Sequence, residues 1–256
     1  MPVTLTEIPL PAAGPGASPG LHGVLAVPEG EGPWPAVVVV HEAFGVTAVM
    51  RRQAERLAEA GFLALMPDLF SAGGARRCLA STFRTLAAGE GRAFVDVESA
   101  RRLLVGRSDC TGRVGVIGFC MGGGFALAAA SRGFDASSVN YGMLPEDLDG
   151  VLDGACPIVA SYGGRDRQLA GSADRLEAAL AVHGIPHDVR EYPDAGHAFL
   201  NDAETGPRAL RPVLRAVGMG PEPASAADAW RRIDAFLDAH LRAGHRDGAP
   251  AGAAGS

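Results

Sequence analysis

The chain has 256 residues, enough for one large α/β domain or two small ones, and a formal net charge of −6. An acidic chain without a basic run argues against a general role in nucleic-acid binding. All 23 cationic residues are arginine. The absence of lysine from the sequence excludes chemistry that depends on one, such as Schiff-base formation or a phosphate-loop lysine.

The N-terminal sequence and the cysteines bear on where the protein works. Residues 1–11 have no basic stretch followed by an apolar one, so no signal peptide is expected, and no apolar run is long enough to span a membrane. The four cysteines form no C-x-x-C pair, which argues against a structural zinc site. We therefore expect a cytoplasmic protein with free thiols, without a metal or a cofactor.

The first part of the chain alternates extended and helical patterns. Residues 3–10 and 21–28 are expected to form an antiparallel pair of strands. The β-branched run at 35–42 is typical of a strand buried on both faces. Apolar residues at helical spacing predict a helix over 47–61, and residues 62–68 predict a second buried strand.

The middle of the chain continues this alternation. Residues 71–92 are rich in glycine, contain a short helical stretch and are a candidate lid. A helix is predicted over 93–106, a strand over 113–119, a helix from Met121 and a strand over 137–142.

The last elements complete the pattern. Residues 156–166 and 187–193 predict strands, 172–184 predicts a helix, and 224–241 predicts an amphipathic helix. Such alternation implies an α/β protein with a mostly parallel central sheet flanked by helices on both faces.

No internal repeat or central linker divides the sequence. We expect residues 1–241 to form a single domain. The small and polar residues at 242–256 predict a disordered tail.

The most specific stretch is GVIGFCMGGGFALAAA, residues 115–130. Cys120 stands between Gly118 and Gly122, in a G-x-nucleophile-x-G pattern that follows a strand and opens a helix. Such a turn places the sulfur at a helix N-terminus, where backbone N–H groups and the helix dipole favour a thiolate. The backbone N–H of Met121 is then expected to face a developing oxyanion.

The loop after the strand at 35–42 is expected to border the same crevice, because the carboxyl ends of parallel strands share one edge of a sheet. The backbone N–H of Ala43 is the candidate second oxyanion donor. Glu42 is a candidate to accept the proton of Cys120 or to help place His197. We expect His41 to pack or to hydrogen-bond locally.

A nucleophile on such a turn is usually followed along the chain by an acid and then a histidine. Asp166 comes just after a predicted strand, and His197 lies on the loop after the last one. Asp194 is a rival acid, but it sits only three residues from His197. Asp166 is therefore expected to fix the imidazole tautomer, while His197 keeps Cys120 as a thiolate.

Six segments of the chain together resemble the dienelactone hydrolase family of the α/β-hydrolase superfamily. They are spread between about residue 20 and residue 241: HEAFG (41–45), PDLF (67–70), GFCMGG (118–123), SYGGRD (161–166), AGHAF (195–199) and AADAWRRIDAF (226–236). The resemblance implies the α/β-hydrolase fold, a triad of Cys120, Asp166 and His197, and a Glu42 that lies beside the thiol and takes part in its activation.

The resemblance also implies an activity. Family members typically open the enol-lactone dienelactone to maleylacetate, so we expect a carboxylic ester hydrolase of the carboxymethylenebutenolidase type. It would cleave lactones or small esters through a cysteine nucleophile and an acyl-enzyme intermediate. The expected partner is a small molecule, with no nucleic acid and no membrane, and the expected state is a monomer or small homo-oligomer.

Two alternatives stay open. Dienelactone carries a carboxylate, yet residues 198–201 after His197 contain no cation, and the connection over 203–223 is longer than usual. Both features leave the natural substrate open, and the missing cation favours a general carboxylesterase or thioesterase of the same fold. The other alternative is a non-catalytic, redox-sensing protein in which Cys120 is a reactive thiol.

Overall fold

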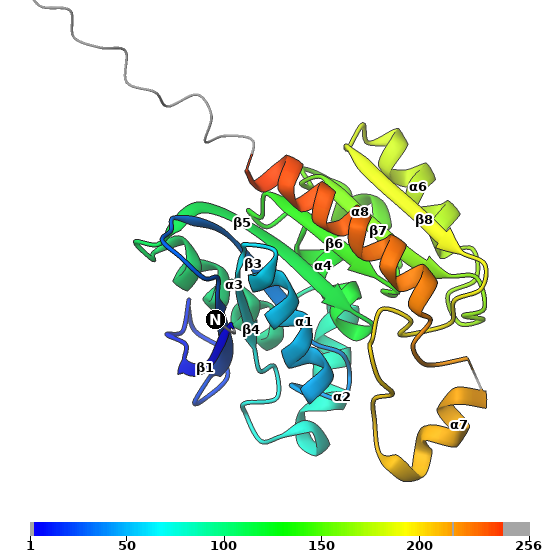
Figure 1. Ribbon diagram of the computed structural model, residues 1–256, viewed down its shortest axis with the longest axis horizontal. Coiled ribbons are helices and arrows are strands. Elements are labelled where there is room, and N and C mark those ends of the chain that lie inside the picture. The colour runs from blue at the N-terminus through cyan, green and yellow to red at the C-terminus, as the bar shows by residue number, and fades with distance from the viewer. Residues whose placement is uncertain (1–2, 217, 243–256) are drawn as a thin grey trace, which may run out of the picture.

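A central sheet carries the fold. The computed structural model describes residues 3–216 and 218–242, and there the sheet has eight strands in the order β1-β2-β4-β3-β5-β6-β7-β8 (Figure 1). The strands are β1 (Thr4–Pro9), β2 (His22–Val27), β3 (Trp34–Val40), β4 (Leu63–Pro67), β5 (Cys110–Phe119), β6 (Ala136–Asn140), β7 (Ile158–Gly163) and β8 (His187–Tyr192). β2 is antiparallel to both β1 and β4, and the other strand pairs are parallel. This confirms the mostly parallel sheet.

Helices cover both faces of the sheet. They are α1 (Ala48–Glu59), α2 (Ala75–Ala88), α3 (Arg92–Val105), α4 (Met121–Ala129), α5 (Leu148–Leu152), α6 (Ser172–Val182), α7 (Arg211–Ala216) and α8 (Pro223–Leu241), with a 3-10 helix at Arg208–Leu210. α1 and α8 lie on the face toward the viewer in Figure 1, while α3, α4 and α6 pack behind it. β4 and all of β3 except Trp34 are buried between these layers, which explains their unbroken apolar runs.

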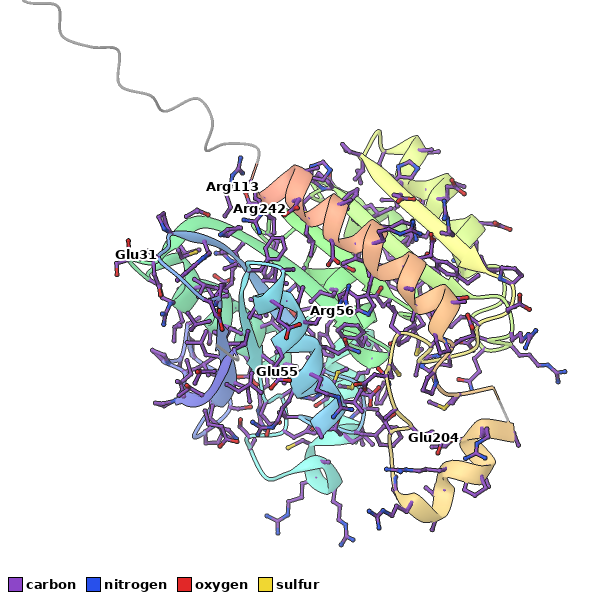
Figure 2. The ribbon with its side chains drawn as sticks, in the orientation of Figure 1. Glu31, Glu55, Arg56, Arg113, Glu204 and Arg242 are labelled. Carbon is purple, nitrogen blue, oxygen red and sulfur yellow. The ribbon has the colours of Figure 1, made fainter. Side chains whose placement is uncertain are left out.

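Arg56 joins the two helices on the near face of the sheet (Figure 2). It extends from α1 toward α8, where Nη2 donates to Asp234 at 3.0 Å. Its guanidinium group also lies 4.5 Å from the centre of the Trp230 ring. Such a cation–π contact contributes about 0.5–1 kcal/mol at a partly exposed site. The contact therefore helps to hold α8 against the half of the sheet that carries β3.

Two regions differ from the sequence prediction. The candidate lid contains a full 14-residue helix, α2, which ends at Gly89 in the left-handed conformation. The connection over 203–223 contains the 3-10 helix and α7, neither of which was predicted. None of the residues of these two short helices is buried, so they show no apolar periodicity from which to predict them.

Three other predictions from the sequence concern the tail, membrane-spanning helices and the number of domains. The predicted tail at 242–256 lies outside the described residues apart from Arg242. In the described ranges, no helix combines the length and the apolar character that crossing a membrane requires. The single domain over 1–241 stays a prediction.

Candidate active site

The turn between β5 and α4 holds Cys120 in an uncommon backbone conformation, with φ 57° and ψ −116°. Its two flanking glycines are required by close packing. A Cβ on Gly118 would lie 1.8 Å from the carbonyl oxygen of Gly122, and a Cβ on Gly122 would lie 2.0 Å from that of Val40. Only glycine fits at these positions, so the sequence around Cys120 is dictated by a sharp strand-to-helix turn.

His197 is held by the predicted acid. Its Nδ1 lies 2.5 Å from Oδ2 of Asp166, which is buried and follows β7. The rival carboxylate of Asp194 is 72% exposed and bonds to Arg165 instead, at 2.6 Å. The structure thus brings Asp166, and not Asp194, to the imidazole. Nδ1 donates in this bond, so Nε2 is the ring nitrogen left for other partners.

The surroundings of His197 favour its protonated form. Burial opposes a charge on the ring, but the hydrogen bonds to the Asp166 carboxylate and the Cys120 sulfur outweigh it and raise the pKa of His197 to about 10. A protonated imidazole beside the sulfur is the arrangement in which a cysteine serves as a thiolate.

The two candidate oxyanion donors, the backbone N–H groups of Met121 and Ala43, are left free; Met121 lines the same cavity as Cys120, whereas Ala43 lines a neighbouring one. Met121 is the first residue of α4, and Ala43 lies in the loop after β3. In the part of the chain that the structure describes, neither N–H donates a hydrogen bond. By contrast, the N–H of Cys120 donates to Asn140 at 3.0 Å. Free N–H groups at the end of a strand and the start of a helix can bind a developing oxyanion.

Glu42 is 2% exposed and lies on the flank of the site formed by β3. Its Oε2 accepts a hydrogen bond from Nδ2 of Asn201 at 3.1 Å. Burial raises the pKa of Glu42, while hydrogen bonds from Asn201 and Thr205 and the charge of His197 act in the opposite direction. No hydrogen bond between described residues joins Glu42 to Cys120. The charges of Glu42 and His197 act on each other.

His41 has a local role, as expected. The side chain is fully buried. Its Nε2 accepts from the N–H of Leu69 at 3.1 Å, and its Nδ1 lies 2.8 Å from the carbonyl oxygen of Glu42. Nδ1 must then carry the proton and donate to that carbonyl. Burial lowers the pKa of His41, despite the bond to Glu42 and the charge of Asp68. His41 thus fixes the loop that bears Glu42.

A cavity of about 890 Å³ opens over Cys120 and His197. Its wall is mostly apolar, with Phe83 from α2, Met143 after β6 and Met219 from the 203–223 connection. The candidate lid thus contributes a side chain to this wall. Two arginines, residues 165 and 167, line the cavity beside Asp166. A cavity of this size suits a small organic substrate.

Three contacts of the site were not predicted from the sequence. Tyr141 follows β6, and its ring centre lies 5.1 Å from that of His197. Asn201 bonds to Glu42, and Met219 of the 203–223 connection pairs with the backbone of His197. The place of Tyr141 in the site could have been predicted, because the residue directly follows a strand whose carboxyl end borders the crevice. Asn201 and Met219 carried no such signal.

The other cysteines and the acidic side chains do not form a metal site in the described ranges. No group of three or more His, Cys, Asp or Glu residues there could hold a metal ion. Cys78 is buried, and Cys110 and Cys156 are partly buried free thiols. None of the three lines the cavity over Cys120.

Together, the sheet topology and the turn after β5 place the protein in the α/β-hydrolase fold, among its ester-cleaving enzymes. Residues 21–241 match the sequence model of the dienelactone hydrolase family. The chain belongs to that family and is a hydrolase that acts on ester or lactone bonds.

Individual relatives agree with this assignment. A protein of Methylorubrum extorquens is 31% identical over 227 residues, covering 81% of this chain and 73% of its own. The carboxymethylenebutenolidase of Rhodococcus opacus is 29% identical over 224 residues, covering 81% and 82%. A solved structure of a dienelactone hydrolase-like promiscuous phosphotriesterase from metagenomic libraries has a TM-score of 0.74 at 22% identity, covering 93% of this chain and 99% of that one. The last likeness establishes the fold.

Proposed function

We propose that the protein hydrolyses lactones or small activated esters with Cys120 as the nucleophile, through an acyl-enzyme thioester. The observation that carries this proposal is the position of Cys120. It occupies a strained turn at the start of α4, and its sulfur faces a histidine that Asp166 holds at 2.5 Å. A nucleophile, a base and a residue that orients the base are thus assembled in one place.

The first half of the reaction forms the thioester. The Cys120 thiolate attacks the carbonyl carbon, and a C–S bond forms as the carbonyl oxygen becomes an oxyanion. The backbone N–H groups of Met121 and Ala43 donate to this oxygen. Collapse of the intermediate breaks the bond to the alkoxy oxygen, which takes the Nε2 proton of His197. The alcohol leaves, and His197 is then neutral.

The second half restores the enzyme. Neutral His197 takes a proton from water, and the hydroxide attacks the thioester carbonyl. Collapse breaks the C–S bond, releases the carboxylic acid and returns the thiolate beside a protonated His197. In a ring substrate, the alcohol and the acid are two ends of one product. Asp166 accepts the hydrogen bond from Nδ1 of His197 throughout the cycle.

Glu42 supports the charge that this cycle requires on His197. Its carboxylate lies within electrostatic reach of the imidazole in a buried setting, where charges interact strongly. An ionised Glu42 favours the protonated imidazole and thereby the thiolate. This assigns the residue an electrostatic part in thiol activation, with no proton transfer between Glu42 and Cys120.

A general carboxylesterase or thioesterase is the second candidate. Residue 201 is an asparagine bonded to Glu42, so the segment after His197 supplies no cation for a substrate carboxylate. The apolar side chains of Phe83, Met143 and Met219 in the cavity wall also suit neutral substrates. Values of kcat/KM for dienelactone and for neutral esters of similar size separate the two candidates. A strong preference for the carboxylate-bearing lactone excludes the second.

The test of the mechanism compares the wild type with Cys120→Ala on p-nitrophenyl acetate and dienelactone. We expect turnover to be lost in Cys120→Ala and kept in Cys156→Ala, whose thiol lies outside the cavity. Mass spectrometry of the quenched wild type should detect one acetyl group on the peptide that contains Cys120. Undiminished hydrolysis by Cys120→Ala contradicts the proposal, and rapid alkylation of Cys120 without turnover favours the redox-sensing alternative. Cytoplasmic location and a monomeric or small oligomeric state stay predictions from the sequence.

A further inference from the structure

Several buried polar atoms near the proposed triad have no hydrogen-bond partner in the described structure. They include the hydroxyl of Tyr141, Oε1 of Glu42 and Oδ1 of Asn201. Tyr141 is fully buried and Glu42 is 2% exposed. Leaving a polar atom both buried and unpaired costs free energy, so such atoms call for a functional or solvent-related explanation.

Tyr141 is held in place against its own backbone preference. Its φ is 41°, in the left-handed region that bulky residues rarely adopt. The surrounding chain enforces this conformation, because its N–H donates to the carbonyl of Ser161 at 2.8 Å. The next residue, Gly142, packs so tightly that a Cβ on it would lie 2.4 Å from the backbone of Gly123 in α4. Strain of this kind concentrates at functional sites.

The side chain of Tyr141 reaches the triad. Its ring centre lies 5.1 Å from that of His197, and the residue lines the same cavity as Cys120. Burial and the negative charges of Glu42 and Cys120 raise the pKa of Tyr141 well above its ordinary value. The phenol is therefore neutral at any working pH and has a proton to donate toward two neighbouring acids.

One oxygen of the Glu42 carboxylate, Oε1, lacks a hydrogen-bond donor. Its Oε2 already accepts from Asn201, and the Thr205 hydroxyl is also bonded to the carboxylate, whereas Oε1 accepts from no group. The first turn of α4 lies between the two residues, because Gly122 packs against the carbonyl oxygen of His41 and Gly123 packs against Gly142, and the charge of Glu42 acts on Tyr141. The two unpaired atoms do not bond to each other directly, so a single buried water between them would satisfy both.

We propose that Tyr141 is a positioning residue whose hydroxyl donates to Oε1 of Glu42 through one buried water, and that this link keeps Glu42 ionised beside His197. The proposal rests on the proposed function, because it acts through the electrostatic part assigned to Glu42 there. Besides burial, four groups act on the charge of Glu42, and they come from separate parts of the fold: Tyr141 after β6, His197 and Asn201 after β8, and Thr205 from the 203–223 connection.

The loss of this one hydroxyl has a defined consequence. Without it, Glu42 keeps its burial but loses a donor, so its pKa rises further. The ionised form then requires a higher pH, and His197 loses a negative charge that supports its protonation. The acidic limb of the pH–rate profile should therefore move to higher pH, which the loss of packing alone would not produce.

The test compares Tyr141→Phe with Tyr162→Phe. Tyr162 is an equally buried tyrosine, on β7, whose hydroxyl donates to the carbonyl of Gly142 at 3.2 Å. Both substitutions remove one hydroxyl and keep the ring. For Tyr141→Phe we expect kcat for p-nitrophenyl acetate at pH 7 to fall by about 10- to 100-fold, the effect of losing one hydrogen bond to a charged group. Its acidic limb and the pH dependence of Cys120 alkylation by iodoacetamide should both shift upward. Neither should shift in Tyr162→Phe.

A double variant decides whether Tyr141 acts through Glu42. Glu42→Gln removes the charge, so adding Tyr141→Phe to it should lower kcat by less than about twofold. A Tyr141→Phe profile that superimposes on that of the wild type overturns the proposal, as does a double variant that shows the full product of the two losses. Failure of the proposed function itself is separately visible, because Cys120→Ala would then retain turnover.

Discussion

The hydrogen bond from Nδ2 of Asn201 to Oε2 of Glu42, 3.1 Å long, joins residues that are 159 positions apart in the chain. Glu42 follows β3 and Asn201 follows the loop of His197, so the bond closes the site across the carboxyl ends of the strands. It also holds a carboxylate in a setting where burial disfavours its charge. The protein thus keeps an unfavourable group beside the proposed triad, which is typical of functional sites.

We expect the substitution Glu42→Gln to raise the stability of the protein and to lower its activity. The folded pKa of Glu42 is raised, so its ionisation destabilises the fold, and this cost grows as pH rises above its unfolded value. At pH 8, Glu42→Gln should raise Tm by about 2–4 °C, the shift that about 1 kcal/mol produces in a domain of this size. The gain should shrink at pH 5, and kcat/KM should fall. Thermal unfolding at both values of pH measures this, with Glu55→Gln on α1 as the control. An equal gain at both values would contradict the assignment.

Two matched substitutions test which carboxylate is the acid partner of His197. Asp166→Asn keeps the shape of the side chain but removes the charge that supports a protonated imidazole, so kcat should fall at least about 100-fold. Asp194→Asn breaks only an exposed ion pair with Arg165 and should stay within about twofold of the wild type. Steady-state kinetics of the two variants on one ester make the comparison. Equal losses in both would show that the choice of Asp166 is wrong.

The charge on His197 should persist into alkaline solution. Its pKa is raised to about 10 by hydrogen bonds to Asp166 and Cys120 that outweigh burial. The ring should therefore stay protonated from neutral pH upward and lose its proton only as pH rises through about 10. Cys120→Ala removes one of these bonds, so the midpoint should move down. An NMR titration of the imidazole signals measures both midpoints. An unchanged His197 midpoint would mean that the sulfur does not act on the ring.

The glycines around Cys120 should tolerate no side chain. In Gly118→Ala, the new Cβ would lie 1.8 Å from the carbonyl oxygen of Gly122, so the turn must open or the fold must yield. We expect a destabilisation of more than about 3 kcal/mol, or no folded protein. Gly14→Ala places a Cβ in open space and serves as the control. Thermal unfolding and soluble yield are the measurements, and a Gly118→Ala protein as stable as the wild type would refute the tight turn.

The turn at Cys120 and the order of its partners were predictable because their determinants are local. Gly118 and Gly122 are visible in the sequence, and the physical reason for them is contact within one turn. The positions of Asp166 and His197 follow from another simple rule, that the ends of parallel strands meet at one edge. These features also carried the family resemblance, which the match over 21–241 confirms.

The remaining features depend on side-chain packing that no local pattern encodes. The bond between Asn201 and Glu42 forms only if the loops after β8 and β3 have one particular position relative to each other. The left-handed backbone of Tyr141 follows from the packing of Gly142 against α4. The helix α7 has no buried side chain, so it leaves no apolar period in the sequence.

The 203–223 connection contacts the backbone of the loop that bears His197. Met219 pairs with His197, the N–H of Gly220 donates to the His197 carbonyl at 2.9 Å, and a Cβ on Gly196 would lie 1.8 Å from the carbonyl of Gly218. Its outer part, which includes α7, stands away from the sheet (Figure 1). Insertions and deletions can therefore accumulate in that outer part while the proposed reacting groups are retained. Through evolution, or in a designed library, such length changes offer a way to acquire new substrates without rebuilding the proposed triad.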